Sequence, residues 1–291
     1  MRPAEEGLLL LRCALGRPLA PLSEGEYQTL SRLLRERFPE RRAERLTECE
    51  LRLLGYETRT AERIARLLER SEAVERYFAA AEDVRAITRI SDDFPRRLRL
   101  LGAHCPPALF CRGDCSLLNR PAVCLVGSRR LSEENRRFAR TIGALAAREG
   151  RVLISGGATG ADTEAQNACL EAGGSVICFV PDALLRRREH PRVLYCSDEG
   201  YELPFTAARA LRRNHYIHTA AELSFVAQCE AGKGGTWSGA SDALRRGLTP
   251  LFVFRDGSRG CAALVDLGAV PVDANVTSFA SLRPMTLSIF D

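Results

Sequence analysis

Four short segments of the chain carry Gly, Arg, Lys, Ser or Thr, the residue types that bind phosphate groups. The first is Gly127-Ser128-Arg129, which follows the apolar run 122–126. A glycine after a strand lets the backbone turn and approach a ligand closely. Ser128 offers a hydroxyl, and the guanidinium of Arg129 can hold a phosphate through two hydrogen bonds. A plain strand-to-helix turn with solvated arginines explains this segment equally well.

The second segment is a glycine-rich loop that follows another apolar run and opens a helix. It reads Ser155-Gly156-Gly157-Ala158-Thr159-Gly160-Ala161-Asp162. Free N–H groups and the positive end of the helix dipole favour an anion there. The loop lacks both the strict G-x-G-x-x-G spacing and the Lys-Ser/Thr of a Walker A loop. We predict an anion-binding loop, with loop architecture alone as the alternative. Asp162 would repel a phosphate at the helix end, so we expect it to cap the helix or accept from a hydroxyl.

The two remaining segments carry basic side chains. The third contains Arg213 and Asn214, although a solvated helix face would look the same. The fourth, residues 232–239, holds Lys233, the single lysine among 42 basic residues. Its glycines cost backbone entropy, which indicates a structural need for them, and a lysine flanked by bare backbone suits a phosphate. Its candidate contacts are Lys233, Gly234, Gly235, Thr236 and Gly239.

The sequence shows no catalytic constellation. It contains no G-x-S-x-G and no H-E-x-x-H motif, and the four segments offer no pair of carboxylates for acid–base chemistry. The eleven cysteines include no C-x-x-C pair. The local group of His104, Cys105, Cys111 and Cys115 has poor spacing for zinc. We therefore expect no metal, no cofactor and no enzymatic activity.

The four segments depend on strands and helices that alternate along the chain. Apolar runs occur at 122–126, 151–155, 175–180, 223–227 and 251–254. Helices are expected at 132–149, with Ser132 as the N-cap, and at 161–172. This alternation predicts an α/β fold with an extended, Rossmann-like, doubly wound and mostly parallel sheet. Ligands of such sheets bind beyond the carboxyl ends of the strands, where all four segments lie.

The chain divides into four parts by pattern. Residues 1–90 show helical spacing of leucines and predict a small all-helical N-terminal domain. Residues 91–120 are rich in Pro, Gly and Asp and predict a connecting segment packed on the core. Residues 121–275 form the predicted Rossmann-like domain. Residues 276–291 are left as a C-terminal tail.

Composition excludes several classes of protein. The chain has 291 residues, is 45% hydrophobic and carries a net charge of +5, an excess too small to argue for nucleic acid by itself. No apolar run approaches the roughly 18 residues of a membrane span. The run Leu8-Leu9-Leu10-Leu11 is cut by Arg12 and does not resemble a signal peptide. We expect a cytoplasmic protein without membrane contact.

The order of these motifs resembles the DNA-processing protein A (DprA/Smf) family. Gly127-Ser128-Arg129 matches the family's G-S-R, and residues 155–162 match its S-G-x-A-x-G-I-D. Arg213-Asn214-His215 matches the start of its R-N-R-I-I, and residues 233–240 cover its S-G-S/T-L-x-T-A loop. Similar segments lie upstream at 94–113 and downstream at 260–269. The resemblance covers roughly residues 90–270.

The resemblance implies single-stranded DNA bound in the Rossmann pocket of a homodimer. It further implies loading of a RecA-type recombinase during DNA uptake, transformation or recombination. Arg129, Arg213 and Lys233 would neutralise backbone phosphates, and the glycine loops would let the strand approach. Gln166 replaces a family His, and His215 replaces the second Arg of R-N-R. We expect a divergent branch without the family's C-terminal winged-helix domain.

Two other functions remain open from the sequence. One is a nucleotide-binding sensor, or a nucleoside-monophosphate phosphoribohydrolase similar to the Lonely Guy enzymes of the same superfamily. Their G-G-x-G-T-x-x-E loop matches Gly235-Thr236, but its Glu position falls on Gly239. A closed pocket would suit a mononucleotide, whereas an open basic groove would suit a strand. The other is a scaffold with a vestigial site, since fold alone does not define function.

Overall fold

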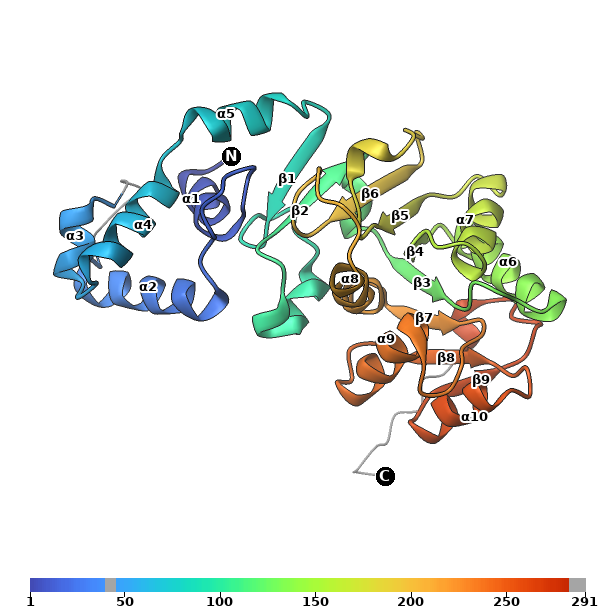
Figure 1. Ribbon diagram of the computed structural model, residues 1–291. Helices are drawn as coiled ribbons and strands as arrows, with labels where there is room; N and C mark the ends of the chain where they lie inside the picture. The colour runs from blue at the N-terminus through green and yellow to red at the C-terminus, as the bar shows by residue number, and fades with distance from the viewer. Residues whose placement is uncertain (40–45, 283–291) are drawn as a thin grey trace.

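The computed structural model describes residues 1–39 and 46–282 and contains a nine-stranded sheet (Figure 1). The strand order is β1-β2-β6-β5-β4-β3-β7-β8-β9. Neighbouring strands from β6 through to β9 are parallel, whereas β1–β2 and β2–β6 are antiparallel. The strands are β1 (Val84–Thr88), β2 (Ala108–Arg112), β3 (Ala122–Val126), β4 (Val152–Ser155), β5 (Val176–Phe179), β6 (Val193–Ser197), β7 (Leu223–Val226), β8 (Leu251–Phe254) and β9 (Val270–Val272).

Five helices precede the sheet, and the others alternate with its strands. The first group is α1 (Pro3–Arg12), α2 (Glu24–Arg37), α3 (Glu48–Leu53), α4 (Thr58–Leu68) and α5 (Glu72–Ala79). The second group is α6 (Glu133–Arg148), α7 (Ala161–Glu171), α8 (Ala207–Ala220), α9 (Gly234–Arg245) and α10 (Arg259–Asp266). Four 3₁₀ helices complete the described elements: η1 (Arg96–His104), η2 (Cys115–Asn119), η3 (Leu184–Arg186) and η4 (Phe279–Ser281). Among the described helices, none has the length and apolarity needed to cross a bilayer.

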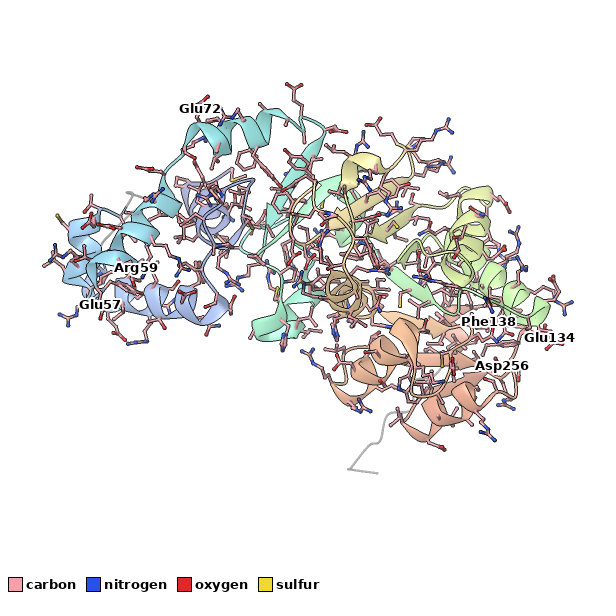
Figure 2. All side chains as sticks on the ribbon, viewed as in Figure 1. Glu57, Arg59, Glu72, Glu134, Phe138 and Asp256 are labelled. Atoms are coloured by element: carbon pink, nitrogen blue, oxygen red, sulfur yellow. The ribbon has the colours of Figure 1, made fainter. Side chains whose placement is uncertain are left out.

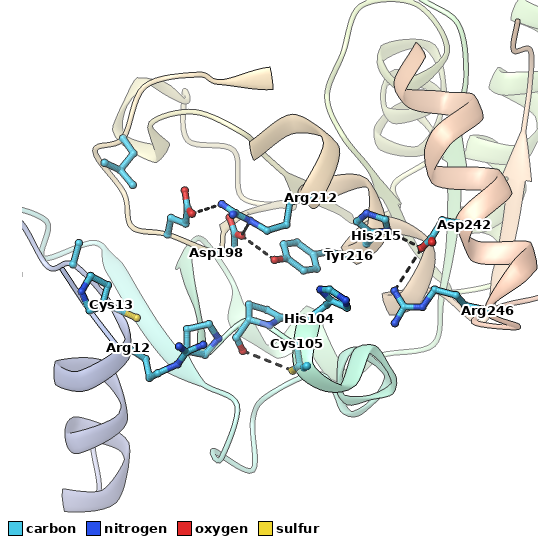
Figure 3. Close-up of a pocket in the computed structure, with 17 residues that line it drawn as sticks. Arg12, Cys13, His104, Cys105, Asp198, Arg212, His215, Tyr216, Asp242 and Arg246 are labelled. Atoms are coloured by element: carbon cyan, nitrogen blue, oxygen red, sulfur yellow. Dashed lines mark hydrogen bonds and ion pairs between the residues drawn. The ribbon is translucent and has the colours of Figure 1, made fainter. Parts of the chain in front are cut away.

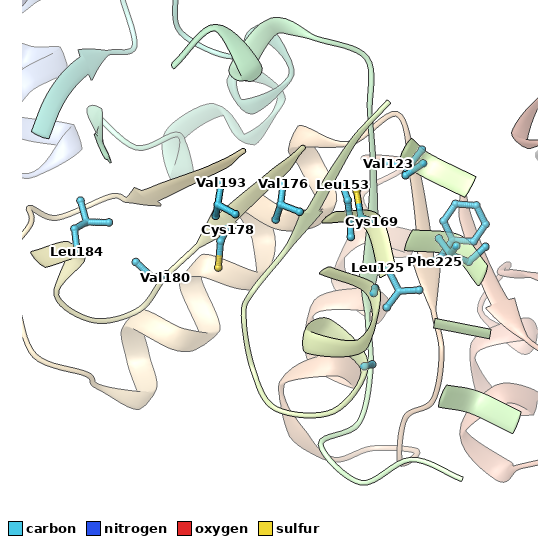
Figure 4. Close-up of a cluster of buried hydrophobic side chains, with 14 of the residues drawn as sticks. Val123, Leu125, Leu153, Cys169, Val176, Cys178, Val180, Leu184, Val193 and Phe225 are labelled. Atoms are coloured by element: carbon cyan, nitrogen blue, oxygen red, sulfur yellow. The ribbon is translucent and has the colours of Figure 1, made fainter. Parts of the chain in front are cut away.

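Alternating strand residues supply two separate cores, one on each face of the sheet. On one face, Leu125, Leu153 and Cys178 belong to one cluster of buried side chains (Figure 4). This cluster also contains Phe138 of α6 and Ala165 of α7. On the other face, the neighbouring strand residues pack beneath α8, α9, α10 and η1; they include Cys124, Ile154, Ile177, Val226 and Val253. The doubly wound, Rossmann-like fold predicted from the apolar runs is confirmed.

The predicted helix at 132–149 is α6, and its start is fixed as expected. The Ser132 hydroxyl accepts a hydrogen bond from the backbone N of Asn135 at 3.2 Å. This capping bond satisfies one of the backbone donors that a helix start leaves free. The Asn135 side chain then donates to the carbonyl of Ala227 at 2.7 Å, which ties the start of α6 to the end of β7.

The order of the strands creates one switch point. From β3 the chain proceeds outward through β4, β5 and β6, then returns to place β7 on the other side of β3. The loops that follow β3 and β7 therefore diverge at the carboxyl edge of the sheet. Such a divergence is where open α/β sheets form a ligand crevice.

Two of the predicted domain boundaries differ from the structure. Strand β1 falls inside the range 1–90 that was predicted to be helical, and its residues pair with β2 at the edge of the sheet. Strand β2 lies within the predicted connecting segment 91–120, so this segment extends the sheet itself. Arg85 interrupts the apolar pattern of β1, and Pro106-Pro107 and Gly113-Asp114 flank β2, which hid both strands from the periodicity analysis.

The start of the predicted C-terminal tail belongs to the core. Phe279 is 2% exposed and its ring lies 5.4 Å from that of Phe225, centroid to centroid. The backbone N of Phe279 also donates to the carboxylate of Glu149 at 2.9 Å. Residues 276–282 therefore cover one face of the sheet, and residues 283–291 of the predicted tail lie outside the described residues.

The N-terminal helices have a small core of their own and also contact the sheet domain. Their core contains Leu11, Leu22, Leu30, Leu51, Leu54, Ala61, Ile64, Leu67 and Leu68. Charged residues such as Glu57, Arg59 and Glu72 lie on the outer surface of these helices (Figure 2). At the junction, the Tyr77 hydroxyl donates to Glu202 at 2.8 Å, and the Tyr201 hydroxyl donates to the carbonyl of Tyr77 at 2.7 Å. The helices are thereby attached to the loop that precedes α8.

A close helix contact on the sheet yields a stability prediction. A Cβ added at Gly143 of α6 would lie 2.1 Å from the carbonyl oxygen of Ala165 on α7, so Gly143→Ala should lower the free energy of unfolding by about 1–3 kcal/mol. The matched control is Gly25→Ala in α2, where a Cβ meets nothing within 4 Å. This control should leave stability unchanged or raise it by a few tenths of a kcal/mol. Urea denaturation measures the free energy of unfolding of both variants. Equal changes in Gly143→Ala and Gly25→Ala would contradict the close contact at Gly143.

Candidate groove at the strand switch point

A groove of about 970 Å³ lies at the switch point, between the carboxyl ends of β3 and β7 and helices α8 and α9. Five basic and two acidic side chains line it: Arg129, Arg130, Arg213, Lys233, Arg245, Asp162 and Glu230. All four predicted segments contribute to its wall. Of the predicted site residues, the groove brings together Gly127, Ser128, Arg129, Asp162, Arg213, Asn214, Lys233, Gly234, Gly235 and Thr236.

The first and fourth segments are joined to each other at the base of the groove. The Thr236 hydroxyl donates to the carbonyl of Gly127 at 3.0 Å, and the backbone N of Ser128 donates to the carbonyl of Gln228 at 2.9 Å. Gly127 has no room for a side chain, because a Cβ there would lie 2.6 Å from Cβ of Ala161. Gly127 therefore allows the start of α7 to pack closely against the end of β3. Arg129 extends from this turn as an exposed side chain.

The second segment differs from the predicted phosphate loop. The carboxylate of Asp162 is 4% exposed and accepts hydrogen bonds from the backbone N of Gly156 at 3.0 Å and of Ala158 at 3.3 Å. Burial raises the pKa of the Asp162 carboxyl, while the charge of Arg213 and the backbone amides oppose that rise by stabilising the carboxylate. Asp162 accepts from backbone amides, where the sequence suggested a helix cap or a hydroxyl. Two amides that were expected to bind a phosphate are thus already occupied.

Arg213 lies across this loop. A Cβ added at Gly156 would be only 1.4 Å from Nη1 of Arg213, so the guanidinium packs directly on the bare backbone. Burial lowers the pKa of Arg213, and the negative charge of Asp162 acts against this. The Nε atom of Arg213 is buried and has no hydrogen-bond partner in the described structure. Arg213 is therefore a half-buried cation whose positive charge stabilises the Asp162 carboxylate.

The fourth segment opens α9 and packs closely on α8. The Asn214 side chain donates to the carbonyl of Gly235 at 3.0 Å. A Cβ at Gly235 would lie 2.8 Å from Nδ2 of Asn214, and one at Gly239 would lie 3.1 Å from Nε2 of His218. These two glycines allow the helices to approach each other. Lys233 is exposed and its Nζ lies 2.9 Å from Glu230, an ion pair that solvent weakens and a phosphate could replace.

Six predicted site residues do not line the groove: Ser155, Gly156, Gly157, Thr159, Gly160 and Gly239. Ser155 is fully buried and accepts from the Gln166 side chain at 2.6 Å. Thr159 is exposed beside the groove. Gly160 has a φ of +93° and no room for a Cβ, which would lie 2.4 Å from the carbonyl oxygen of Ser128. These residues shape the loop that supports the groove.

The structure adds lining residues that the motifs did not identify. Phe205 is 57% exposed and Leu211 is 47% exposed, and both face the groove from the segment around the start of α8. Trp237, considered in the sequence as a stacking platform, lines the groove but also packs against the core. An aromatic next to Pro204 in a polar loop is the signal that could have identified Phe205. An exposed aromatic ring in a basic groove offers a stacking surface.

The loop that carries Phe205 is held from beneath by Arg209. This side chain is 5% exposed and donates to the carbonyls of Leu203 at 2.9 Å and Pro204 at 2.8 Å. Its other terminal nitrogen donates to Ser197 at the end of β6 at 3.1 Å. A buried guanidinium with several carbonyl acceptors fixes the backbone. Phe205 is thus presented from a braced loop.

A buried polar chain lies under the floor of the groove. The Cys124 thiol donates to the Ser224 hydroxyl at 3.1 Å, and that hydroxyl lies 2.6 Å from Nδ1 of His218. With Ser224 donating to Nδ1, the imidazole proton sits on Nε2, the atom nearest Gly239. Burial lowers the pKa of His218 to about 4, and the nearby His215 adds to this effect. His218 is therefore neutral near pH 7.

A second cavity, of about 740 Å³, lies on the opposite side of α8, between the Rossmann-like domain and the N-terminal helices (Figure 3). Asp198 accepts from Arg212 at 2.7 Å and from the Tyr216 hydroxyl at 2.8 Å. His215 lies 2.8 Å from Asp242. These contacts hold the far face of α8, and this leaves Arg213 and its neighbours directed at the groove. Within the described residues, no group of three His, Cys, Asp or Glu side chains is arranged to hold a metal ion.

The fold and the groove define a Rossmann-like α/β protein with a basic crevice at its switch point. A family model described as DNA recombination-mediator protein A matches residues 85–282. This match spans more than half of the chain, so the chain belongs to the DNA recombination-mediator protein A family, a family of DNA-processing proteins. The resemblance inferred from the motifs is confirmed.

Two solved structures are similar to this chain. One is DNA processing protein A from Streptococcus pneumoniae, with 23% identity and a TM-score of 0.60, covering 86% of this chain and 95% of that one. The other is DNA processing protein A from Helicobacter pylori, described for its single-stranded DNA binding mode. It has 25% identity and a TM-score of 0.56, covering 65% of this chain and 90% of that one. A comparison with curated proteins finds no match.

The buried imidazole predicts how stability depends on pH. The pKa of His218 is about 4 in the folded chain against a reference value of 6.5, so only the unfolded chain binds this proton between those values. The stability that the neutral His218 contributes is complete above pH 6.5. It is lost as the pH falls toward 4, by at most about 1.4 kcal/mol per pH unit. In urea denaturation from pH 7 to 4, the free energy of unfolding should decline less steeply for His218→Gln than for the wild type.

The control for this measurement is His104→Gln, which removes an exposed imidazole. This variant should follow the wild-type pH profile. A profile for His218→Gln that runs parallel to the wild type would show that His218 is protonated in the folded state as easily as in the unfolded one.

Proposed function

We propose that the groove binds single-stranded DNA and that the protein acts in DNA recombination or uptake by holding that strand. The observation that carries this proposal is the combination, in one crevice, of exposed cations with an exposed aromatic ring. Arg129 and Arg130 lie on one side, Lys233 and Arg245 on the other, and Phe205 faces the same space. Cations that follow a backbone beside a stacking surface are typical of sequence-independent single-strand binding. The similarity to the Helicobacter pylori protein supports the same ligand.

The exposed cations differ in role from Arg213. Arg129, Arg130 and Lys233 are exposed, so they can move to meet a phosphate and release its counterions. Arg213 is packed on Gly156 and shares its charge with Asp162, so it contributes a fixed positive field. We expect the exposed residues to contribute most of the salt dependence of binding. Contacts of this kind position a strand without reading its sequence.

The proposal assigns no catalytic step to the groove. Its two carboxylates are Asp162, which accepts from buried backbone amides, and Glu230, which pairs with Lys233 at the surface. The hydrolase loop to which this region is related requires a Glu where Gly239 stands, and Gly239 packs against His218. We therefore favour binding over catalysis, and the loading of a RecA-type recombinase by a homodimer as the biological role.

The recombinase and the homodimer are tested together. Light scattering should give twice the mass of one chain, and the protein should speed the assembly of a RecA-type filament on DNA coated with single-strand binding protein. A monomer without effect on assembly would restrict the function to strand binding. The groove variants described next separate loading from DNA binding.

Binding of a fluorescent oligo-dT should weaken steeply with salt. A plot of log K against log salt should have a slope of about −0.7 for each phosphate neutralised, and Arg129→Ala and Lys233→Ala should each remove about that much. The control is Arg76→Ala, an exposed arginine on α5 of the N-terminal helices. Anisotropy at several salt concentrations measures the slopes. Wild-type affinity that ignores salt would contradict the electrostatic basis of the groove.

Removal of the exposed Phe205 ring should affect DNA binding differently from removal of a cation. Phe205→Ala should weaken oligo-dT binding by about 1–3 kcal/mol, because stacking on one base is lost, while the salt slope stays unchanged. Leu53→Ala, which removes a side chain that is 74% exposed on α3, is the control and should have no effect. A change of slope in Phe205→Ala would mean that the loop positions cations and does not offer a stacking surface.

A further inference from the structure

The hollow at the carboxyl end of β4 is where an α/β sheet commonly accepts the phosphate of a nucleotide. In this protein an internal carboxylate already fills it. The same oxygen of Asp162 accepts from the backbone N of Gly156 and of Ala158. The amide of Gly127, at the end of the neighbouring strand β3, also stabilises this carboxylate. Amides from two strand ends thus converge on one side chain of the protein itself.

Two further donors beside this carboxylate are occupied as well. The backbone N of Ala161 donates to the carbonyl of Ser128 at 3.2 Å, and that of Thr163 donates to the carbonyl of Ala158 at 3.3 Å. These are amides of the first turn of α7, the donors that a bound phosphate would use. Arg213 covers the loop from the groove side, where no Cβ fits at position 156. The carboxylate of Asp162 thus takes two of the amides that a phosphate would use at this end of the sheet.

We propose that Asp162 is a specificity-determining residue that excludes the terminal phosphate of free nucleotides from the groove. Its carboxylate takes the position of that phosphate, so the available cations are the exposed side chains along the groove. A DNA strand meets several of these cations at once through successive phosphates, whereas a mononucleotide meets one or two. This inference deepens the proposed function and rests on it, because it explains why the same crevice selects a strand over a nucleotide.

The electrostatics of the hollow support this role. Like charges in a buried site repel strongly, because little solvent screens them. A terminal phosphate carries close to two negative charges near pH 7. Placing it beside the Asp162 carboxylate would set two anionic groups against the positive charge of Arg213. Removal of the carboxylate should reverse the preference, since it frees two amides and the full charge of Arg213 for an outside anion.

The test is the replacement of the lost carboxylate by an added anion. In Asp162→Ala the amides of Gly156 and Ala158 lose their acceptor, so the variant should be less stable than the wild type in chloride. Inorganic phosphate at equal ionic strength should raise its Tm by a few degrees through binding to the folded state. The wild-type Tm should show no such difference between phosphate and chloride. Asp162→Ser keeps one short acceptor and is the second variant, expected to fold and to respond in the same direction.

The matched control is Glu164→Ala on the same turn of α7. Glu164 pairs with Arg136 and Arg140 of α6 and does not line the groove. The Tm of Glu164→Ala should be equal in phosphate and chloride. A second readout is AMP binding by calorimetry, which should be at least tenfold tighter in Asp162→Ala and Asp162→Ser than in the wild type.

The outcomes separate this inference from the proposed function. Phosphate rescue in both Asp162 variants, without rescue of the wild type or Glu164→Ala, supports the exclusion role even if oligo-dT binding fails. An unchanged Tm and unchanged AMP affinity in Asp162→Ser would overturn it, whatever the DNA result. A wild type that binds AMP as tightly as the Asp162 variants would also overturn the exclusion role, and it would favour the nucleotide-sensor alternative for the groove.

Discussion

The buried carboxylate of Asp162 connects the parts of the molecule that form the groove. It accepts from the loop after β4, is stabilised by the end of β3, and shares charge with Arg213 on α8. A buried carboxylate is unfavourable unless donors and a cation surround it. The two strand ends and the helix must therefore stay in register around this one group. The geometry of the groove above it follows from that requirement.

Most glycines of the four motifs are required by close packing inside the protein. Gly156 gives space to the guanidinium of Arg213, and Gly235 and Gly239 allow α9 to lie close to α8. This arrangement changes the interpretation of a glycine-rich phosphate motif. Bare backbone can be required by a neighbouring side chain as readily as by a ligand. What remains open to solvent is a set of side-chain cations with one aromatic ring.

Helix α8 is held on both sides. The contacts of Arg212 with Asp198 and of His215 with Asp242 fix the face toward the N-terminal helices, while Arg213 and Asn214 occupy the face toward the groove. The loop before α8 is joined to the N-terminal helices through Tyr77 and braced by Arg209. The N-terminal helices thus contribute to the position of Phe205 without lining the groove themselves. This gives them a physical role in the site even where they make no contact with a ligand.

The sequence by itself determined the fold class and the location of the site. Continuous apolar runs such as 122–126 and 251–254 specify buried parallel strands, and buried strands place their following loops at one edge. It did not reveal β1, β2, β6 and β9, three of which lie at the two ends of the sheet. Arg85 interrupts the apolar pattern of β1, Pro271 lies within β9, and Pro107 and Pro191 stand at or near the starts of β2 and β6, so polar and turn residues dominate the local pattern. Motif spacing identified Arg129, Arg213 and Lys233 as basic residues of one site. Only the tertiary structure decided how freely each of them can move: Arg213 is half-buried because it packs on Gly156, whereas Arg129 remains exposed. Spacing along a chain records which residues share an edge, but burial and charge pairing depend on neighbours that are distant in sequence.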